Sequence, residues 1–139
     1  MDDQYNLQRF VSAQQPIFDI VREELSKGSK RSHWMWFIFP QIEGLGHSEM
    51  AHKYAISSLE EARAYLQHPL LGPRLRECSR LVAAVDGRSI EEIFAYPDYM
   101  KFQSSMTLFA QAALDDQIFN ECLQKYFDGE PDSSTLSRL

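Results

Sequence analysis

Apolar residues at helical spacing, separated by helix start and stop signals, constrain this chain more than any other feature. From residue 7 to residue 25 they recur at intervals of one, three, four and six residues: Leu7, Phe10, Val11, Ile17, Phe18, Val21 and Leu25. This spacing places them on one helical face, as in an amphipathic helix. Pro16 predicts a break near residues 13–15, and Lys27 followed by Gly28 predicts the end of the helix.

Capping residues predict where the later helices begin. Ser48 precedes a helical pattern, and Ser58 and Ser89 are each followed by Glu at the third position, the spacing of a capping box. Pro73 and Pro97 each open a further periodic segment, and Asp132 caps a last short turn. These signals predict six or seven helices.

Residues 34–39 depart from the helical period. Their sequence, WMWFIF, is continuously apolar and is closed by Pro40. The run is short, so we interpret it as a buried strand or an extended core segment. We therefore predict a mainly α, compact single-domain bundle over residues 1–139, with at most a short strand or extended segment around 34–39.

Composition and charge exclude several classes of protein. The chain has 14 Lys and Arg against 20 Asp and Glu, a net charge of −6, which opposes general nucleic-acid binding. Its longest apolar run falls far short of the roughly 20 residues that cross a bilayer, so no membrane association is expected. An acidic N-terminus and only two cysteines predict a cytoplasmic protein without a disulfide framework.

The sequence contains few residues in the spacing of a cofactor or metal motif. His47 and His52 lie five residues apart, which places them on different sides of a helix, and Glu49-x-x-His52 has no second copy to complete a bundle metal site. No glycine-rich phosphate loop is present in the sequence. We expect no metal and no cofactor.

Two segments carry more polar chemistry than packing requires. In residues 32–41, Trp34 and Trp36 lie close to His33 and Gln41, which suits a stacking wall with polar groups at its edge. The alternative is that both tryptophans belong to the core.

In residues 98–107, Lys101, Ser104 and Ser105 share one helical face. They are candidates for binding a ligand. The alternative is close helix packing with internal hydrogen bonds.

These segments resemble a known family. Residues 33–41 (HWMWFIFPQ), 44–46 (GLG), 68–75 (HPLLGPRL) and 101–109 (KFQSSMTLF) resemble the signature of domain-of-unknown-function family 1810. The resemblance runs through nearly the whole chain. It implies a compact, mostly helical single domain, and it implies no established activity.

A second similarity is shorter. Residues 48–54 (SEMAHKY), 71–74 (LGPR) and 101–102 (KF) are similar, in order, to motifs of the NADAR superfamily. That similarity implies hydrolysis of an N-glycosidic bond in ADP-ribose or a related riboside.

Such chemistry needs a carboxylate beside the ribose, because positive charge develops there in the transition state. Glu49 is the candidate for this carboxylate or for the base that activates water, with His33 as proton donor. A glutamate in a first helical turn also commonly serves only to stabilise the helix dipole. Residues expected to bind substrate are Trp36, stacking a base, Lys101, holding a phosphate or the leaving group, and the polar residues Gln41, Ser48, Ser104 and Ser105.

Two functions therefore remain open. The first is a small enzyme with a nucleotide- or riboside-sized pocket, which predicts that these residues converge in one cleft. The second is a non-catalytic binding or interaction module, which predicts no polar cleft and an exposed apolar patch of several hundred Å2. The sequence identifies no protein partner.

Overall fold

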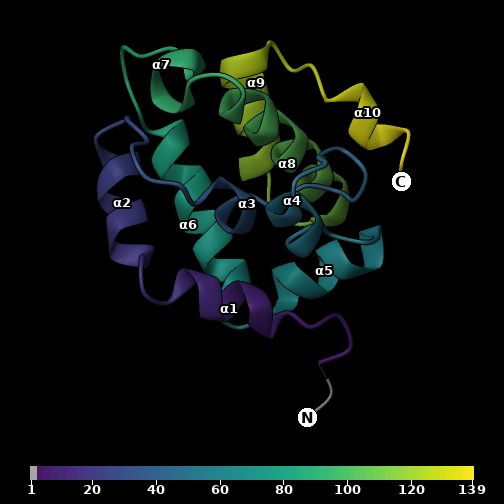
Figure 1. The fold of residues 1–139 in the computed structure, drawn as a ribbon. Helices are drawn as coiled ribbons and strands as arrows, with labels where there is room; N and C mark the ends of the chain where they lie inside the picture. The colour runs from purple at the N-terminus through teal and green to yellow at the C-terminus, as the bar shows by residue number, and fades with distance from the viewer. Residues whose placement is uncertain (1–2) are drawn as a thin grey trace.

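A computed structural model describes residues 3–139, in which ten helices pack around one another without a strand (Figure 1). The helices are α1 (Gln8–Gln14), α2 (Phe18–Ser26), α3 (Met35–Ile38), α4 (Glu49–Lys53), α5 (Leu59–Gln67), α6 (Leu71–Ala83), α7 (Ile90–Phe94), α8 (Asp98–Ala112), α9 (Ile118–Phe127) and α10 (Ser133–Leu136). The mainly α prediction is confirmed. The count exceeds six or seven because one-turn helices such as α3 and α10 are separate elements.

Local signals at the N-terminal end act as predicted. The apolar stripe is divided near Pro16, since α1 ends at Gln14 and α2 begins at Phe18. Gly28 follows α2 with a φ of 68°, a left-handed conformation that glycine adopts without strain. The backbone N–H of Gly28 donates to the carbonyl of Leu25 at 3.0 Å, which closes the helix end.

The prediction of a strand or extended segment at residues 34–39 is wrong. Met35–Ile38 form the single-turn helix α3, and the tertiary environment overrides the local pattern because the segment is surrounded by core on almost every side. Trp34, Met35, Ile38 and Phe39 are all buried. The nearest feature to a strand is one parallel bridge between Ile42 and Ile56, which joins the loops on either side of α4.

Helix α8 is the central element of the fold. It packs against α5, α7, α9 and α10, while α6 packs against α2, α5 and α9 (Figure 1). Phe102 of α8 is fully buried, and its ring centroid lies 5.0 Å from that of Phe39 and 4.9 Å from that of Phe94. This aromatic cluster fixes the first turns of α8 against α3 and α7.

The capping predictions hold to different degrees. Ser89 and Glu92 form a complete capping box at α7. Ser58 accepts from the backbone N–H of Glu61 as expected, but the Glu61 carboxylate does not reach back to Ser58. It instead accepts from Ser57 and pairs with Arg9 at 3.0 Å, so only half of the predicted box forms.

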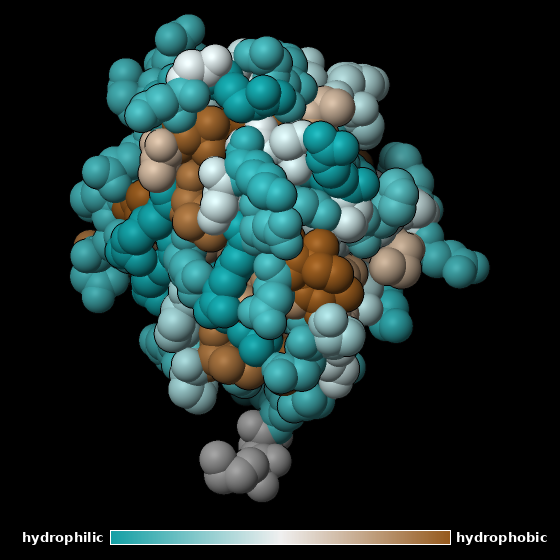
Figure 2. Space-filling view, turned by 90° about the vertical axis from the view of Figure 1, so that its left-hand side faces the viewer, coloured by the Kyte–Doolittle hydropathy of each residue, from teal (hydrophilic) through white to brown (hydrophobic). Residues whose placement is uncertain are grey.

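The face of the molecule that carries α2 is largely hydrophilic, with apolar patches separated by polar side chains (Figure 2). Among residues 3–139, no helix combines the length and the apolar character that a membrane crossing requires.

Candidate functional site

A cavity of about 440 Å³ lies between the loop preceding α4, the first turns of α8 and the start of α10. Its lining includes Gln41, Leu45, Gly46, His47, Ser48, Ala51, Tyr96, Pro97, Met100, Lys101, Ser104, Asp132 and Ser134. A volume in this range suits a small organic ligand. Chain segments about 90 residues apart in the sequence therefore meet at one site.

Lysine 101 contributes a cation to the cavity wall. Its Nζ lies 5.3 Å from the centroid of the Trp36 ring and 3.6 Å from Oδ1 of Asp98. Oδ2 of Asp98 pairs with Nζ of Lys30 at 2.9 Å, and Lys30 in turn lies over the ring of Trp34 at 5.1 Å. One carboxylate thus serves two ammonium groups, so this cluster keeps a surplus positive charge beside the cavity.

Asp132 contributes a carboxylate to the same cavity. Its Oδ2 accepts from the hydroxyls of Ser104 at 3.1 Å and Thr135 at 2.6 Å, and from the backbone N–H of Thr135 at 3.0 Å. All three of these bonds fall on Oδ2, whereas Oδ1 accepts no hydrogen bond from residues 3–139. The backbone N–H of Asp132 donates to Thr107 Oγ1 at 2.8 Å, which fixes this residue against α8.

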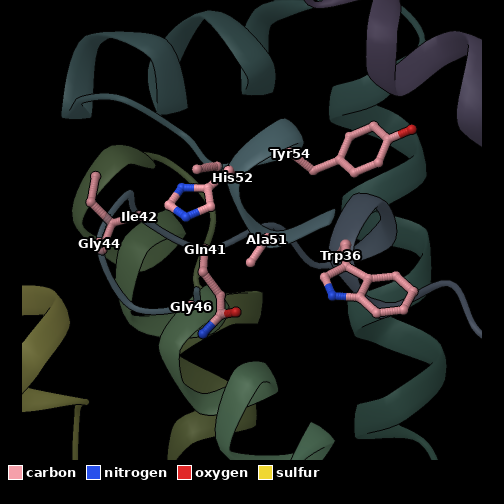
Figure 3. A pocket seen from close by; sticks show the side chains of 9 residues that line it. Trp36, Gln41, Ile42, Gly44, Gly46, Ala51, His52 and Tyr54 are labelled. Atoms are coloured by element: carbon pink, nitrogen blue, oxygen red, sulfur yellow. The ribbon is translucent and has the colours of Figure 1, made fainter. Parts of the chain in front are cut away.

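A much smaller cavity of about 10 Å³ adjoins the first and shares Gln41, Gly46 and Ala51 with it. Figure 3 shows Gln41 extending from the segment after α3, with His52 on one side and Trp36 on the other. This space holds at most about one water molecule. Gln41 therefore stands at the junction between the two cavities.

The structure brings together four of the predicted substrate-binding residues: Gln41, Ser48, Lys101 and Ser104 all line the larger cavity. Trp36 does not line it. The indole borders the small cavity and lies beneath the Lys101 ammonium, so Trp36 reaches the larger cavity only through Lys101.

Three other predicted residues lie elsewhere. Glu49 is exposed in the first turn of α4 and His33 is exposed before α3, and neither lines the cavity. Ser105 is buried in the core, where its hydroxyl has no hydrogen-bond partner among residues 3–139.

Among the other lining residues, three with titratable side chains, Asp132, Tyr96 and His47, are not among the predicted site residues. Asp132 was predicted only as a helix cap, a role that it does fill at α10. Tyr96 and His47 stand in loops where no local pattern marks a function. Within residues 3–139, no three His, Cys, Asp or Glu side chains gather as ligands for a metal ion.

Comparison with known proteins gives a family and a close structural match. Residues 4–139 match the family described as Protein of unknown function (DUF1810). The crystal structure of the conserved hypothetical protein Rv1873 from Mycobacterium tuberculosis is 58% identical, with a TM-score of 0.97, and the match covers 99% of this chain and 98% of that one. No curated protein matches the chain. The chain belongs to the DUF1810 family of proteins of unknown function.

Proposed function

We propose that the protein is an enzyme that hydrolyses the N-glycosidic bond of a nucleotide or an ADP-ribose-type compound in the larger cavity. The observation that carries this proposal is the convergence of Gln41, Ser48, Lys101 and Ser104 on one cavity of about 440 Å³ that also holds the Asp132 carboxylate. Gln41, Ser48 and Lys101 come from separate segments and are not buried, so packing of the core does not account for their convergence. Ser104 is buried beside them.

One cation is available to an anionic ligand. Lys101 lines the cavity, and it shares the single carboxylate of Asp98 with Lys30, so Asp98 neutralises only part of this pair. The Asp132 carboxylate in the same cavity balances the overall charge, but the Lys101 ammonium can still pair with a phosphate group. Ser48 lines the same space, and its hydroxyl proton can be donated to a phosphate or sugar oxygen, since Ser48 Oγ only accepts a bond from Ala51 N–H. Ser104 donates its proton to Asp132, so its oxygen can only accept from a sugar hydroxyl.

The carboxylate that the reaction requires is better supplied by Asp132 than by Glu49, since Asp132 lines the cavity and Glu49 does not. In the reaction, the bond between ribose C1′ and the base nitrogen breaks and its electron pair leaves with the base. Water supplies hydroxide to C1′ and a proton to the base. Oδ1 of Asp132 would stabilise the positive charge on the ribose or take the proton of the water. His47 lines the same cavity and is the group placed to protonate the leaving base.

Thermal unfolding in the presence of a ligand panel tests binding. The panel is NAD, ADP-ribose, AMP, GMP and ribose 5-phosphate. A ligand at 100 times its dissociation constant adds about 2.7 kcal/mol to the free energy of unfolding, which raises Tm by several degrees. Lys101→Ala should abolish that shift. Lys27→Ala is the matched control, because Lys27 is exposed and pairs only with Glu23 in its own helix, and it should leave the shift unchanged.

Chromatographic detection of released base tests catalysis. Asp132→Asn should lower the rate of base release at least about 100-fold while ligand binding persists, and Glu49→Gln should leave the rate unchanged. If Glu49→Gln instead lowered the rate of base release and Asp132→Asn did not, Glu49 would be the carboxylate that the reaction requires. Binding without any base release would support the non-catalytic binding module, and the absence of binding by every compound would refute the proposed function.

The protein is also proposed to be cytoplasmic. Cys78 and Cys122 are both unpaired thiols, as is usual for proteins of a reducing compartment.

A further inference from the structure

We propose that Tyr96 is the stacking face for the planar base of the ligand, an inference that rests on the proposed function. Tyr96 lines the larger cavity, and 73% of its surface is exposed. An aromatic ring exposed to water at the mouth of a cavity lacks the stabilisation that aromatic side chains ordinarily gain from burial. Met100, 48% exposed, also lines the cavity and is a second exposed apolar side chain there.

The backbone beside Tyr96 is held in an uncommon conformation. Ala95 has a φ of 62° and a ψ of 172°, a region that is essentially restricted to glycine and that strains a residue with a Cβ. The conformation is fixed on both sides: Ala95 N–H donates to the Glu91 carbonyl at 2.8 Å, and the Ala95 carbonyl accepts from Tyr99 N–H at 3.0 Å. Such strain is characteristic of ligand-binding sites.

The strained turn directs neighbouring side chains to opposite environments. Phe94 is buried in the aromatic cluster of the core, whereas Tyr96, two residues later, lies at the cavity mouth. The ring of Tyr99 lies 6.0 Å from that of Tyr96, at 57°, and supports it from one side. The Tyr96 ring is therefore presented to the cavity by a fixed turn.

Tyr96 suits base stacking better than Trp36, to which the sequence pointed. The Lys101 ammonium lies over the Trp36 indole, and the space beside that indole is only about 10 Å³. Tyr96 and Lys101 instead line one larger cavity. A ligand that combines an aromatic base with an anionic phosphate meets both features at once, and this combination identifies the ligand class as a nucleotide.

A pair of ligands that differ only in the base provides the test. Dissociation constants of AMP and of ribose 5-phosphate are measured by calorimetry for the wild type, Tyr96→Ala and Tyr96→Phe. Tyr96→Ala should weaken AMP binding about 5- to 150-fold, the range found when a stacking aromatic side chain is removed. It should change ribose 5-phosphate binding by less than about twofold, and Tyr96→Phe should retain the affinity for AMP. Leu114→Ala, at a residue that is 86% exposed and outside this cavity, is the matched control.

The outcomes separate the inference from the function on which it rests. If Tyr96→Ala weakens the binding of AMP and of ribose 5-phosphate by the same factor, the ring only shapes the cavity. That result would overturn the stacking role while leaving the nucleotide site in place. Unchanged AMP binding in Tyr96→Ala would overturn it as well. Failure of the wild type to bind either ligand would overturn the proposed function, and the inference with it.

Discussion

Glu24 is a buried carboxylate that organises the segment leading to both tryptophans. Its two oxygens accept from the backbone N–H groups of Arg31 and Ser32, the Ser32 hydroxyl and the Trp34 indole Nε1, at 2.6–3.0 Å. Burial opposes ionisation of this group, but the hydrogen bonds from Ser32, Arg31 and Trp34 outweigh it and lower the pKa of Glu24 to about 2. The ionised form is therefore a structural requirement.

Replacing Glu24 should remove one contribution to the loss of stability in acid. Because the folded pKa is about 2 and lies below the ordinary value of 4.5, the charge contributes its full stability above about pH 4.5 and loses it as pH falls towards 2. Glu24→Gln should lower the free energy of unfolding by about 3 kcal/mol at pH 7, and wild type and variant should converge near pH 2. Urea denaturation across this pH range measures both effects.

Glu23→Gln is the control for this prediction. Glu23 is exposed and pairs with Lys27 on the surface of α2, so its loss should cost at most about 1 kcal/mol. If Glu23→Gln and Glu24→Gln lowered the free energy of unfolding equally at pH 7, the structural role given to Glu24 would be contradicted.

At the scale of elements, the C-terminal segment is attached to α8 by a few specific bonds. Gln103 Nε2 donates to the Glu130 carbonyl at 2.9 Å, and Thr107 Oγ1 accepts from Asp132 N–H at 2.8 Å. Thr135 of α10 is fully buried. This attachment brings Asp132 and Ser134 to the cavity, so the integrity of the site depends on α10 remaining docked.

Thr107→Val should loosen this attachment. Valine keeps the shape of threonine but removes the acceptor for Asp132 N–H, and an unsatisfied buried donor costs about 1–3 kcal/mol. Amide hydrogen exchange in residues 132–136 should accelerate about 5- to 150-fold, and ligand affinity should fall. Ser137→Ala, which removes only an exposed bond to the Ser134 carbonyl, is the control within the same segment. Unaltered exchange in the Thr107 variant would contradict this account.

Helices could be predicted where their determinants are local, and site residues where they belong to a short polar motif. Gln41 and Ser48 come from the chain before α4, and Lys101 and Ser104 come from α8. The stripe of α1 and α2 and the break at Pro16 follow from residues close in sequence. Lys101 and Ser104 were identified because they lie one turn apart on α8. Asp132 reaches that pair through hydrogen bonds with Thr107 and Ser104, which lie 25 and 28 positions earlier in the sequence. No local pattern predicts contacts over such a separation. The wholly apolar segment at α3 has no period to indicate a helix, so packing alone determined its form.

At the scale of the whole molecule, the two cysteines can show whether residues 1–139 form one cooperative domain. Cys78 of α6 and Cys122 of α9 are fully buried, and Cys122 Sγ donates to the Ser79 carbonyl at 3.4 Å. Burial raises the pKa of each thiol to about 12, which suppresses the reactive thiolate in the folded protein. Both thiols should therefore react with a disulfide reagent only after the helices that cover them have separated.

If the chain unfolds as one unit, Cys78 and Cys122 should be labelled at the same rate under native conditions, with the same urea dependence as global unfolding. Labelling is followed separately in the single variants Cys78→Ala and Cys122→Ala, each corrected for its own measured stability. Glu24→Gln should accelerate both reactions by the factor that its loss of stability predicts, although Glu24 lies on α2. Thr107→Val should accelerate labelling less than exchange in residues 132–136, because undocking of α10 leaves α6 and α9 packed together. A faster, urea-insensitive reaction at only one cysteine would instead divide the chain into units that open independently.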